Sequence, residues 1–568
     1  MEYLIDKLKK ELLEAVKTAA GVNIDFEQLE ISAPPDPELG DLAVPCFYLT
    51  KLLRISPNQV ALELKDKIRK PSFVKSIQNV GPYLNFFLDD KILAEKVIKE
   101  IEKKGDKYGS GKKQAGTVML EYSGPNTHKE FHVGHIRNNV LGASLVNLLR
   151  FSGRKLIAVN YIGDIGAHVA KCLWAYDKFH KKDELPENKG KYLGQIYTEA
   201  VKKIEANSLL AEEVSEVQKK LETGDKYWTK LWKQTRQWSL TEFNELYKTI
   251  GVKFDHIFYE SEVEKPGKKI VEELLAKGIA EKSEGAVIID LEKYNLKQFL
   301  LLKSDGSSLY STKELALAKL KFEKFKIDES YMVIDSRQSF YLKQFFKTLE
   351  VMGFDKKLVH IPYEFLTLKD GAMSSRKGNI VSFEDFFEQA VGIIVEDMKE
   401  RHQDWAPEEI KNIARKIALA AIKFYMLRVS NNSVITFDFE EARSYDGFTG
   451  PYLQYTVSRI NSILNKESVK NLAEIDFSKL DHPKEKELLL LAMQFPEIIR
   501  NSVELLEPSQ LAKYLFDLAK SFSSYYQEVP ILNSEVEYKK SRLALIQAVR
   551  QTLVNGLGIL GIEVLDRM

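Results

Sequence analysis

The stretch that decides the fold is Val118-Met119-Leu120-Glu121-Tyr122-Ser123-Gly124-Pro125-Asn126-Thr127-His128-Lys129-Glu130-Phe131-His132-Val133-Gly134-His135. It opens with an apolar run, continues through a polar loop and ends at two histidines. The apolar residues that follow recur at spacings of three and four, which is one face of a helix: Ile136, Val140, Leu141, Leu145, Leu148 and Leu149. A second apolar run covers 156–159. The order strand, loop, helix, strand predicts a βαβ unit of a parallel sheet.

The loop after the first strand of such a unit is where ligands bind. His132 and His135 fall at the start of the helix, where unpaired amide groups carry partial positive charge and favour a phosphate. Their imidazoles add donors at the same place, and Gly134 allows close approach to the backbone. The sequence therefore predicts a phosphate-binding site, although H-x-G-H alone also fits a helix start with one exposed and one packed histidine.

Four stretches of the chain resemble a known family. The string Pro-Asn-x-x-Lys-x-x-His-Val-Gly-His at 125–135 resembles the HIGH signature of class I aminoacyl-tRNA synthetases, in the form used by arginyl-tRNA synthetases. The glycine-bounded loop 371–378 resembles their KMSKS loop, although its serines and cations alone could form any basic surface loop. Residues 447–455 and 565–568 are similar to a DALR-type anticodon-binding domain.

This resemblance covers essentially the whole length and implies a division into four parts. We expect an N-terminal α/β module at 1–105 that touches the corner of the tRNA. An α/β catalytic domain with a Rossmann-like parallel sheet should follow at 106–385, with a helical insertion around 178–250. A helical stem is expected at 386–440 and an all-helical anticodon-binding domain at 441–568. The 568 residues, 44% of them apolar, are enough for several cores.

The resemblance implies an enzyme, an AMP-forming arginine–tRNA ligase of protein biosynthesis. Arginine and ATP would give arginyl-adenylate, and the arginyl group would pass to the terminal ribose of tRNA(Arg). Catalysis should rest on positioning and on donors that meet developing phosphate charge. Mg²⁺ is expected with ATP, held by phosphate oxygens and water. The predicted catalytic residues are His132, His135, Lys129, Ser374, Ser375, Arg376 and Lys377, and Phe131, Val133, Gly134 and Met373 complete the ATP site.

Selection of arginine requires partners for a planar cation with five donors, and carboxylates are the natural choice. Glu121 and Glu314 are the candidates, with Tyr310 covering the guanidinium or its stem. The remaining predicted contacts are Asn126 and Gln338 for the α-amino and carboxylate groups, together with Gly124, Pro125 and His135. The spacing Ser311-x-x-Glu314 also fits a capping box, which would give Glu314 a structural role instead.

The chain departs from the family pattern at several positions. Ala372 and Ser375 stand where the KMSKS loop normally carries lysines, and Lys129 is placed to supply the missing charge from the opposite side. Glu314 stands where an aspartate is usual, which moves the charge by one methylene, and Gly124 stands where a serine is common.

Contacts with tRNA are predicted in both flanking domains. The strand with Asn85 and Phe86 resembles the family's surface for a D-loop base, because an exposed aromatic beside an amide can stack and hydrogen-bond. Tyr452 and Tyr455 are expected to stack on anticodon bases. Core packing is the competing explanation in both places. The net charge of +1 excludes a global attraction to nucleic acid, so any tRNA surface must come from local segregation of charge.

The remaining features bound the class of protein. Two distant cysteines, Cys46 and Cys172, give no C-x-x-C, so no structural metal site is predicted, and they fit a reducing cytoplasm. No apolar run is long enough for a bilayer. Family habit predicts a monomer. The alternatives are a small-molecule nucleotidylyltransferase, which would lack the long helical C-terminus, a non-catalytic tRNA-binding paralogue, and a class I synthetase for another amino acid.

Overall fold

A computed structural model describes residues 2–25, 28–29, 31–369 and 382–568. The predicted loop residues Ala372, Met373, Ser374, Ser375, Arg376 and Lys377 therefore lie outside the described residues. Within the described ranges, no helix combines the length and the apolar character needed to cross a membrane.

The centre of the molecule is a five-stranded parallel sheet with the strand order β11-β10-β4-β5-β6. Its strands are β4 (Thr117–Glu121), β5 (Lys155–Ile162), β6 (His256–Tyr259), β10 (Glu329–Asp335) and β11 (Lys357–Tyr363). Helix α5 (Val133–Phe151) connects β4 to β5, which confirms the predicted βαβ unit. Every residue of β4 is buried, as expected for a parallel strand covered on both faces.

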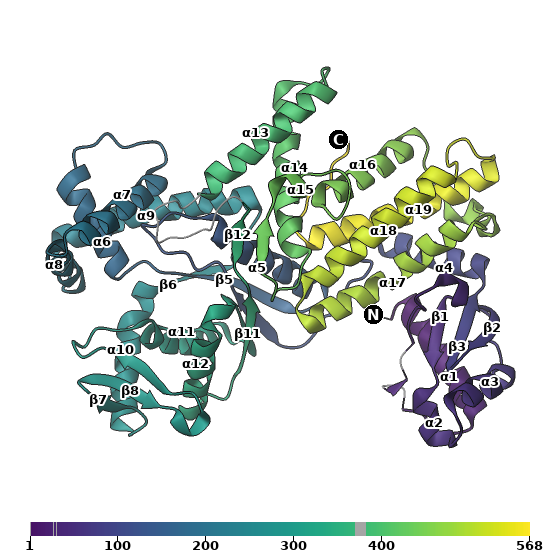
Figure 1. Ribbon diagram of the computed structural model, residues 1–568, viewed down its shortest axis with the longest axis horizontal. Helices are drawn as coiled ribbons and strands as arrows, with labels where there is room; N and C mark the ends of the chain where they lie inside the picture. The colour runs from purple at the N-terminus through teal and green to yellow at the C-terminus, as the bar shows by residue number, and fades with distance from the viewer. Residues whose placement is uncertain (1, 26–27, 30, 370–381) are drawn as a thin grey trace.

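Alternating residues of β4 enter different cores because successive side chains of a strand point to opposite faces. Val118 and Leu120 join the core that contains α5, whereas Met119 packs among the helices on the other face. Those helices are α10 (Glu260–Ala276), α11 (Tyr310–Phe325) and α12 (Ser339–Val351), seen below the sheet in Figure 1. A separate antiparallel sheet lies beside them, built from β7 (Glu281–Ser283), β8 (Ala286–Asp290) and β9 (Gln298–Leu302).

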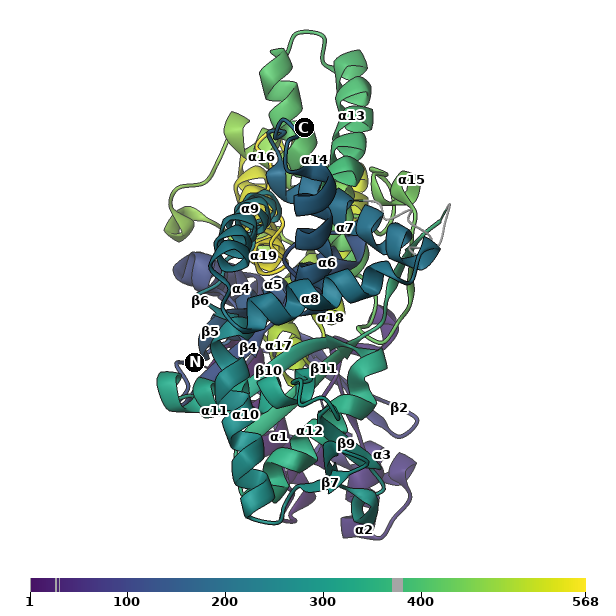
Figure 2. The same cartoon turned by 90° about the vertical axis from the view of Figure 1, so that its left-hand side faces the viewer.

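The predicted helical insertion lies between β5 and β6. It consists of α6 (Ala167–Ala175), a π-helical turn (Tyr176–His180), α7 (Lys189–Ala206), α8 (Leu210–Glu222) and α9 (Lys226–Ile250). These helices have their own core around Trp174 and Leu193 and form one end of the molecule (Figure 1). Figure 2, which faces that end, shows α9 in front of the C-terminal helices.

A helical stem follows the catalytic sheet. Its elements are α13 (Phe383–Arg401), α14 (Pro407–Leu427), α15 (Phe439–Ala442) and a small parallel pair of strands, β12 (Leu366–Leu368) and β13 (Ile435–Phe437). Arg137 of α5 is buried and donates to the carbonyl oxygens of Phe365 and Asn431, at 3.1 and 3.0 Å. The stem is thereby fixed to the helix that carries the two histidines.

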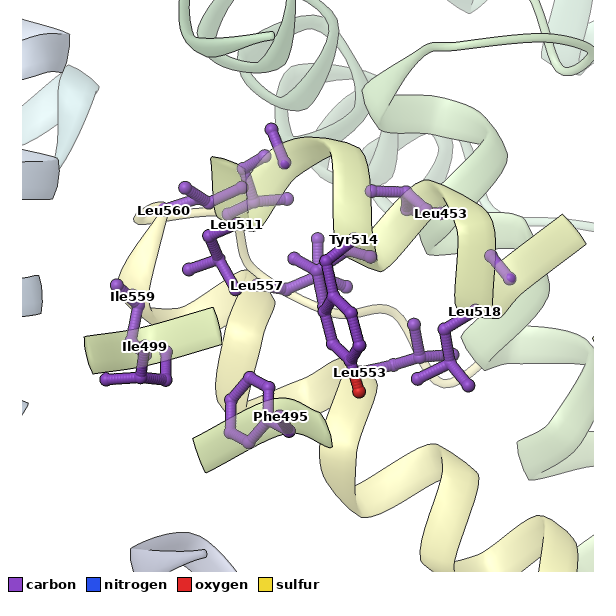
Figure 3. Close-up of a cluster of buried hydrophobic side chains, with 14 of the residues drawn as sticks. Leu453, Phe495, Ile499, Leu511, Tyr514, Leu518, Leu553, Leu557, Ile559 and Leu560 are labelled. Carbon is purple, nitrogen blue, oxygen red and sulfur yellow. The ribbon is translucent and has the colours of Figure 1, made fainter. Parts of the chain in front are cut away.

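The C-terminal domain is a helical bundle of α16 (Gly450–Lys466), α17 (Pro483–Leu505), α18 (Pro508–Glu528) and α19 (Val536–Ile559). Figure 3 shows Phe495, Tyr514, Leu518, Leu553 and Leu557 converging from three of these helices. All five side chains are buried. The bundle confirms the predicted all-α C-terminal domain.

The N-terminal module packs against this bundle. It contains α1 (Leu4–Ala20), β1 (Leu42–Pro45), α2 (Phe47–Leu53), α3 (Pro57–Lys67), β2 (Val74–Val80), β3 (Tyr83–Leu88) and α4 (Asp90–Lys104). Tyr108, just after α4, stacks on Phe495 with ring centroids 5.9 Å apart and donates to the carbonyl oxygen of Ala492 at 2.9 Å. The module is thus joined to the rest of the protein by a packed contact.

The prediction that Asn85 and Phe86 form an exposed base-reading surface is wrong. Strand β3 is the central strand of the antiparallel sheet β1-β3-β2, and its residues Asn85 and Phe86 are only 2% and 0% exposed. Because successive side chains point to opposite faces, both faces of β3 must be covered. The loop at Gly40 approaches Asn85 on one face, and the hydrophobic core takes Phe86 on the other.

Candidate active site

His132 and His135 cap the first turn of α5 reciprocally. The Nδ1 atom of His132 accepts from the Gly134 amide at 3.1 Å, and the Nδ1 atom of His135 accepts from the His132 amide at 3.2 Å. The two ring centroids are 3.8 Å apart. Because both Nδ1 atoms act as acceptors, each neutral ring carries its proton on Nε2. The structure therefore gives the histidines a capping role and leaves a donor on each ring.

Both rings are neutral near pH 7. Burial lowers the pKa of His132 to about 4, with a further contribution from the charge of Lys129. Burial also takes the pKa of His135 well below its usual range, assisted by His132 and Lys129. Positive charge at this end of the site therefore comes from Lys129 and the helix N-terminus, while the imidazoles act as uncharged donors.

The helical insertion holds Lys129 in place. Its neighbour His128 is fully buried and has a φ of 63°, a left-handed conformation that an L-residue adopts at a cost. Helix α9 supports that conformation: the His128 amide donates to the Ser239 hydroxyl at 2.9 Å, and the ring lies 2.8 Å from the Thr235 hydroxyl. The Lys129 ammonium then lies 5.1 Å from the ring centroid of Tyr197 on α7.

Residues directly after the predicted KMSKS-like loop contact the histidine motif. The Phe383 amide donates to the Phe131 carbonyl oxygen at 3.1 Å, and His132 and Ser382 form a β-bridge. The Phe131 ring lies 4.9 Å from that of His135. The side chains of Phe131 and Val133 are buried, so these two predicted ATP contacts offer a ligand their backbone rather than their side chains.

The two predicted arginine-binding carboxylates lie close together. Glu121 ends β4 and Glu314 lies on α11, with exposed fractions of 6% and 1%. Burial raises the pKa of Glu314 to about 7, and the charge of Glu121 adds to that rise. Oε2 of Glu314 accepts from the Tyr341 hydroxyl at 2.8 Å, and the Tyr310 hydroxyl also lowers the pKa of this carboxyl. Oε1 is buried and has no hydrogen bond of normal geometry among the described residues.

The capping-box alternative for Glu314 is wrong. Helix α11 begins at Tyr310 with Leu309 as its N-cap, and the Ser311 hydroxyl donates to the Leu300 carbonyl oxygen at 2.5 Å. The carboxylate of Glu314 is therefore not used to cap the start of the helix. Tyr310 lies beside it at the mouth of the site, 46% exposed, with its ring 5.9 Å from that of Tyr341.

The loop between the two ends is joined to strand β5. The Gly124 amide donates to the Asn160 side-chain oxygen at 3.0 Å, and the Pro125 carbonyl oxygen accepts from the Gly163 amide at 3.1 Å. A Cβ at Gly163 would lie 2.2 Å from the side-chain oxygen of Asn126, so a side chain there would displace it. A glycine at position 163 is thus required for the Asn126 side chain, a predicted arginine contact, to keep its position.

His168, at the start of α6, lies between the arginine end and the nucleotide end. Burial lowers its pKa to about 3, and the charges of Lys129 and Lys313 contribute to the shift. Gln338 ends a short 3₁₀-helix that follows β10, the neighbour of β4 in the sheet, and is exposed. All of the described predicted residues except the tRNA contacts thus lie around the carboxyl edge of one sheet.

Sequence reasoning missed several residues that the structure adds to this crevice. Tyr161 and Tyr341 enclose Glu314 and carry no sequence signal, since they come from distant elements. Lys321, whose ammonium is 2.6 Å from Glu121, did have a signal. It lies seven residues after Glu314, two turns along the same face of α11.

Comparison with known proteins agrees with this arrangement. The family model for class I (R) tRNA synthetase catalytic domains matches residues 97–440, the DALR anticodon binding domain matches 453–568, and the arginyl tRNA synthetase N-terminal domain matches 6–88. The chain is similar to an arginine–tRNA ligase of Bdellovibrio bacteriovorus, with 39% identity over 94% of this chain and 93% of that protein. A ligase of the same name from Clostridium perfringens is 38% identical over 99% and 100%. The solved Thermus thermophilus arginyl-tRNA synthetase superposes with a TM-score of 0.84 at 27% identity, covering 99% and 100%.

Proposed function

This chain belongs to the class I arginyl-tRNA synthetases and has the activity of an arginine–tRNA ligase, and from that premise we propose how its residues divide the work. The substrates are arginine, ATP and tRNA(Arg). The observation that carries the proposal is a buried carboxylate, Glu314, with an unpartnered oxygen on the same sheet edge as two neutral histidines.

The nucleotide binds at the start of α5. The Nε2–H groups of His132 and His135 donate to the ribose and phosphate side of ATP, and Lys129 meets phosphate charge from the insertion side. The loop residues Met373, Ser374, Ser375, Arg376 and Lys377 serve the departing pyrophosphate. The contacts of Phe383 with Phe131 and of Ser382 with His132 support this placement, because they join the end of that loop to the histidine motif. Mg²⁺ enters with ATP, held by phosphate oxygens and water.

Arginine binds with its guanidinium toward Glu314 and Glu121 and its reactive carboxylate toward the nucleotide. Tyr310 covers the side-chain stem, and Asn126, Gln338 and His135 orient the α-amino and carboxylate groups. Gly124 and Pro125 shape the loop between them. A site that pairs buried carboxylates with five fixed donors rejects analogues that leave those carboxylates unpaired.

Anticodon recognition falls to Tyr455. It lines a cleft of about 290 Å³ with Tyr445, Arg401 and Met568, and the Arg459 guanidinium lies 4.6 Å from its ring centroid. A cleft with aromatic rings and guanidinium planes suits an unpaired base. Tyr452 has a supporting role, because its hydroxyl already bonds Ser523 at 3.0 Å.

Among the described residues of the N-terminal module, the exposed aromatics are Phe47 and Tyr83, 52% and 41% exposed, with ring centroids 5.8 Å apart. We propose this pair for the contact with tRNA that buried Asn85 and Phe86 cannot make. The division into 1–105, 106–385, 386–440 and 441–568, a monomeric state and a cytoplasmic location complete the proposal.

Charging assays test the assignment. Purified protein is incubated with ATP and a tRNA(Arg) transcript, and each of the amino acids is supplied in turn. Arginine alone should be attached, and charging should be lost in the variants Glu314→Gln and His135→Ala. Attachment of another amino acid, or retention of arginine charging by Glu314→Gln, would show that the pocket is misplaced.

A further inference from the structure

Four buried carboxylates surround Tyr161 at the arginine end of the crevice. Burial raises the pKa of the Tyr161 hydroxyl well above its usual range, and the charges of Glu260, Glu314, Glu121 and Asp164 add to the rise. Their exposed fractions run from 0% to 7%. Buried carboxylates at such density would repel one another and become protonated unless cations accompanied them.

Resident cations accompany three of the four. Glu260 pairs with Lys313 at 2.5 Å, Asp164 with Arg236 at 2.8 Å, and Glu121 with Lys321 at 2.6 Å. Among the described residues, no lysine, arginine or histidine forms an ion pair with Glu314. Oε1 of Glu314 and Oε2 of Glu121 are both buried without a hydrogen bond among the described residues, but the Glu121 oxygen has Lys321 as its ion-pair partner. Glu314 is therefore the carboxylate left without a resident cation.

Lys321 is the cation whose charge acts on Glu314. Its side chain is 3% exposed, and the side chain of Glu121 is 8% exposed, so solvent screens neither charge well. Lys321 also acts on Glu314, because its charge lowers the pKa of that carboxyl against the opposing effects of burial and Glu121. A single lysine thus balances Glu121 directly and favours the ionised form of Glu314 at a distance.

A count of charge shows what this does for the substrate. Glu121 and Glu314 contribute two negative charges and Lys321 contributes one positive charge, which leaves one negative charge. One guanidinium brings the sum to zero. Without Lys321, the bound complex would bury an unbalanced carboxylate, and the free pocket would hold two carboxylates that cannot both stay ionised cheaply.

We propose that Lys321 is a specificity-determining positioning residue, which holds Glu121 in an internal ion pair and leaves Glu314 as the carboxylate that receives the substrate guanidinium. The inference rests on the proposed placement of arginine and refines it. Glu121 then acts through Lys321 and does not have to contact the guanidinium.

The test follows the pH dependence of kcat/KM for arginine from pH 6 to 9. Groups that face Glu314 are Glu121 of β4, Tyr161 of β5, Tyr310 and Lys321 of α11, and Tyr341 of α12. Burial raises the pKa of Glu314 to about 7, so ionisation of Glu314 sets the acidic limb. The variants are Lys321→Met, Lys321→Arg and the double variant Glu121→Gln with Lys321→Met.

In Lys321→Met the acidic limb should move up by about one pH unit or more, and arginine kcat/KM at pH 7 should fall about tenfold or more and recover toward pH 9. Lys321→Arg should retain the wild-type limb. The double variant should return the limb to within about half a pH unit of wild type, because both opposing charges are removed together.

A merely structural ion pair would lower activity equally at every pH, and an unmoved limb in Lys321→Met overturns the inference. The inference is also overturned if kcat/KM for arginine in the double variant is no higher than in Lys321→Met, because Glu121 would then be needed for contact with arginine. If Lys321→Met does not fold, the same test is made with Lys321→Arg and with the double variant Glu121→Gln, Lys321→Met. The variant Glu314→Gln distinguishes failure of the proposed arginine pocket from failure of the role of Lys321. If Glu314→Gln still uses arginine, the pocket itself is refuted. If Glu314→Gln loses arginine use but the acidic limb of Lys321→Met does not move, only the role of Lys321 is refuted.

Discussion

The arginine end and the nucleotide end of the crevice solve the same problem in opposite ways. Each places ionisable side chains in a buried site, where an isolated charge is unfavourable. At the arginine end the carboxylates are accompanied by lysine and arginine counter-ions, and one is left for the substrate. At the nucleotide end the histidines lose their charge, because burial lowers the pKa of His132 to about 4 and that of His135 well below its usual range.

The difference matches what each end must do. A guanidinium is always charged, so selection of arginine needs a fixed opposite charge. A triphosphate is already strongly negative and is met by Lys129 and the helix N-terminus, so the imidazoles need only supply oriented N–H donors. Charge balance therefore decides function at one end, and geometry decides it at the other.

The largest effect should come from the uncompensated carboxylate. Glu314→Gln removes the charged partner of a buried guanidinium, which costs about 4 kcal/mol, or about a thousandfold in kcat/KM for arginine. The KM for ATP should change less than about threefold, since the other end is untouched. Steady-state charging with tRNA(Arg) measures both. Glu323→Gln, an exposed change on the same helix, is the matched control. If kcat/KM for arginine in Glu314→Gln were no lower than in that control, the arginine end would not depend on this carboxylate.

Loss of an imidazole should reduce the rate rather than the selection of arginine. His132→Ala or His135→Ala each removes a neutral donor that acts on developing phosphate charge, and kcat should fall by about a hundredfold. The KM for arginine should stay within about threefold of wild type. Transient kinetics of adenylate formation measures the step, and His180→Ala, in the π-helical turn of the insertion, is the control. A selective rise in the KM for arginine would mean that the histidines belong to the other end.

The two ends should also differ in pH dependence. With a pKa of about 7, Glu314 is protonated as the pH falls, so kcat/KM for arginine should drop about tenfold per pH unit below that value. Burial lowers the pKa of His132 to about 4 and that of His135 well below its usual range, so both rings stay neutral and kcat/KM for ATP should be flat from pH 6 to 8. Measurements with each substrate varied in turn separate the curves. An imidazole limb between pH 6 and 7 in the ATP curve would contradict the neutral-donor assignment.

The smallest effect should come from the insertion that supports the nucleotide end. Ser239→Ala leaves the buried His128 amide without its acceptor, which should destabilise the fold by about 1–3 kcal/mol and lower kcat about fivefold through Lys129. Ser215→Ala, an exposed serine of the same insertion, should change stability by less than about 0.5 kcal/mol. Denaturant unfolding and charging assays compare the two. Equal kcat in both variants would show that the hydrogen bond from the His128 amide to Ser239 does not position Lys129.

Sequence reasoning succeeded where local geometry fixes function. The βαβ unit and the position of His132 and His135 at a helix start followed from periodicity and from a motif whose residues are close in the chain. Glu121 and Glu314 are far apart in the chain, and their joint role was an expectation from the family resemblance. It failed at Asn85 and Phe86, because the alternation of a strand shows which residues share a face but not whether that face is covered. The central place of β3 and the approach of Gly40 decided the burial.

Identity, domain order and chemistry class were determined by the sequence alone, since each depends on residue types at fixed short spacings. Only the tertiary structure showed that Lys321 neutralises Glu121, that Tyr341 and Tyr161 enclose Glu314, and that α9 holds His128. These contacts join residues 27 to 200 positions apart in the chain. Charges act through space at distances set by packing, so the balance of charge in a buried pocket is a property of the fold and not of any single stretch of sequence.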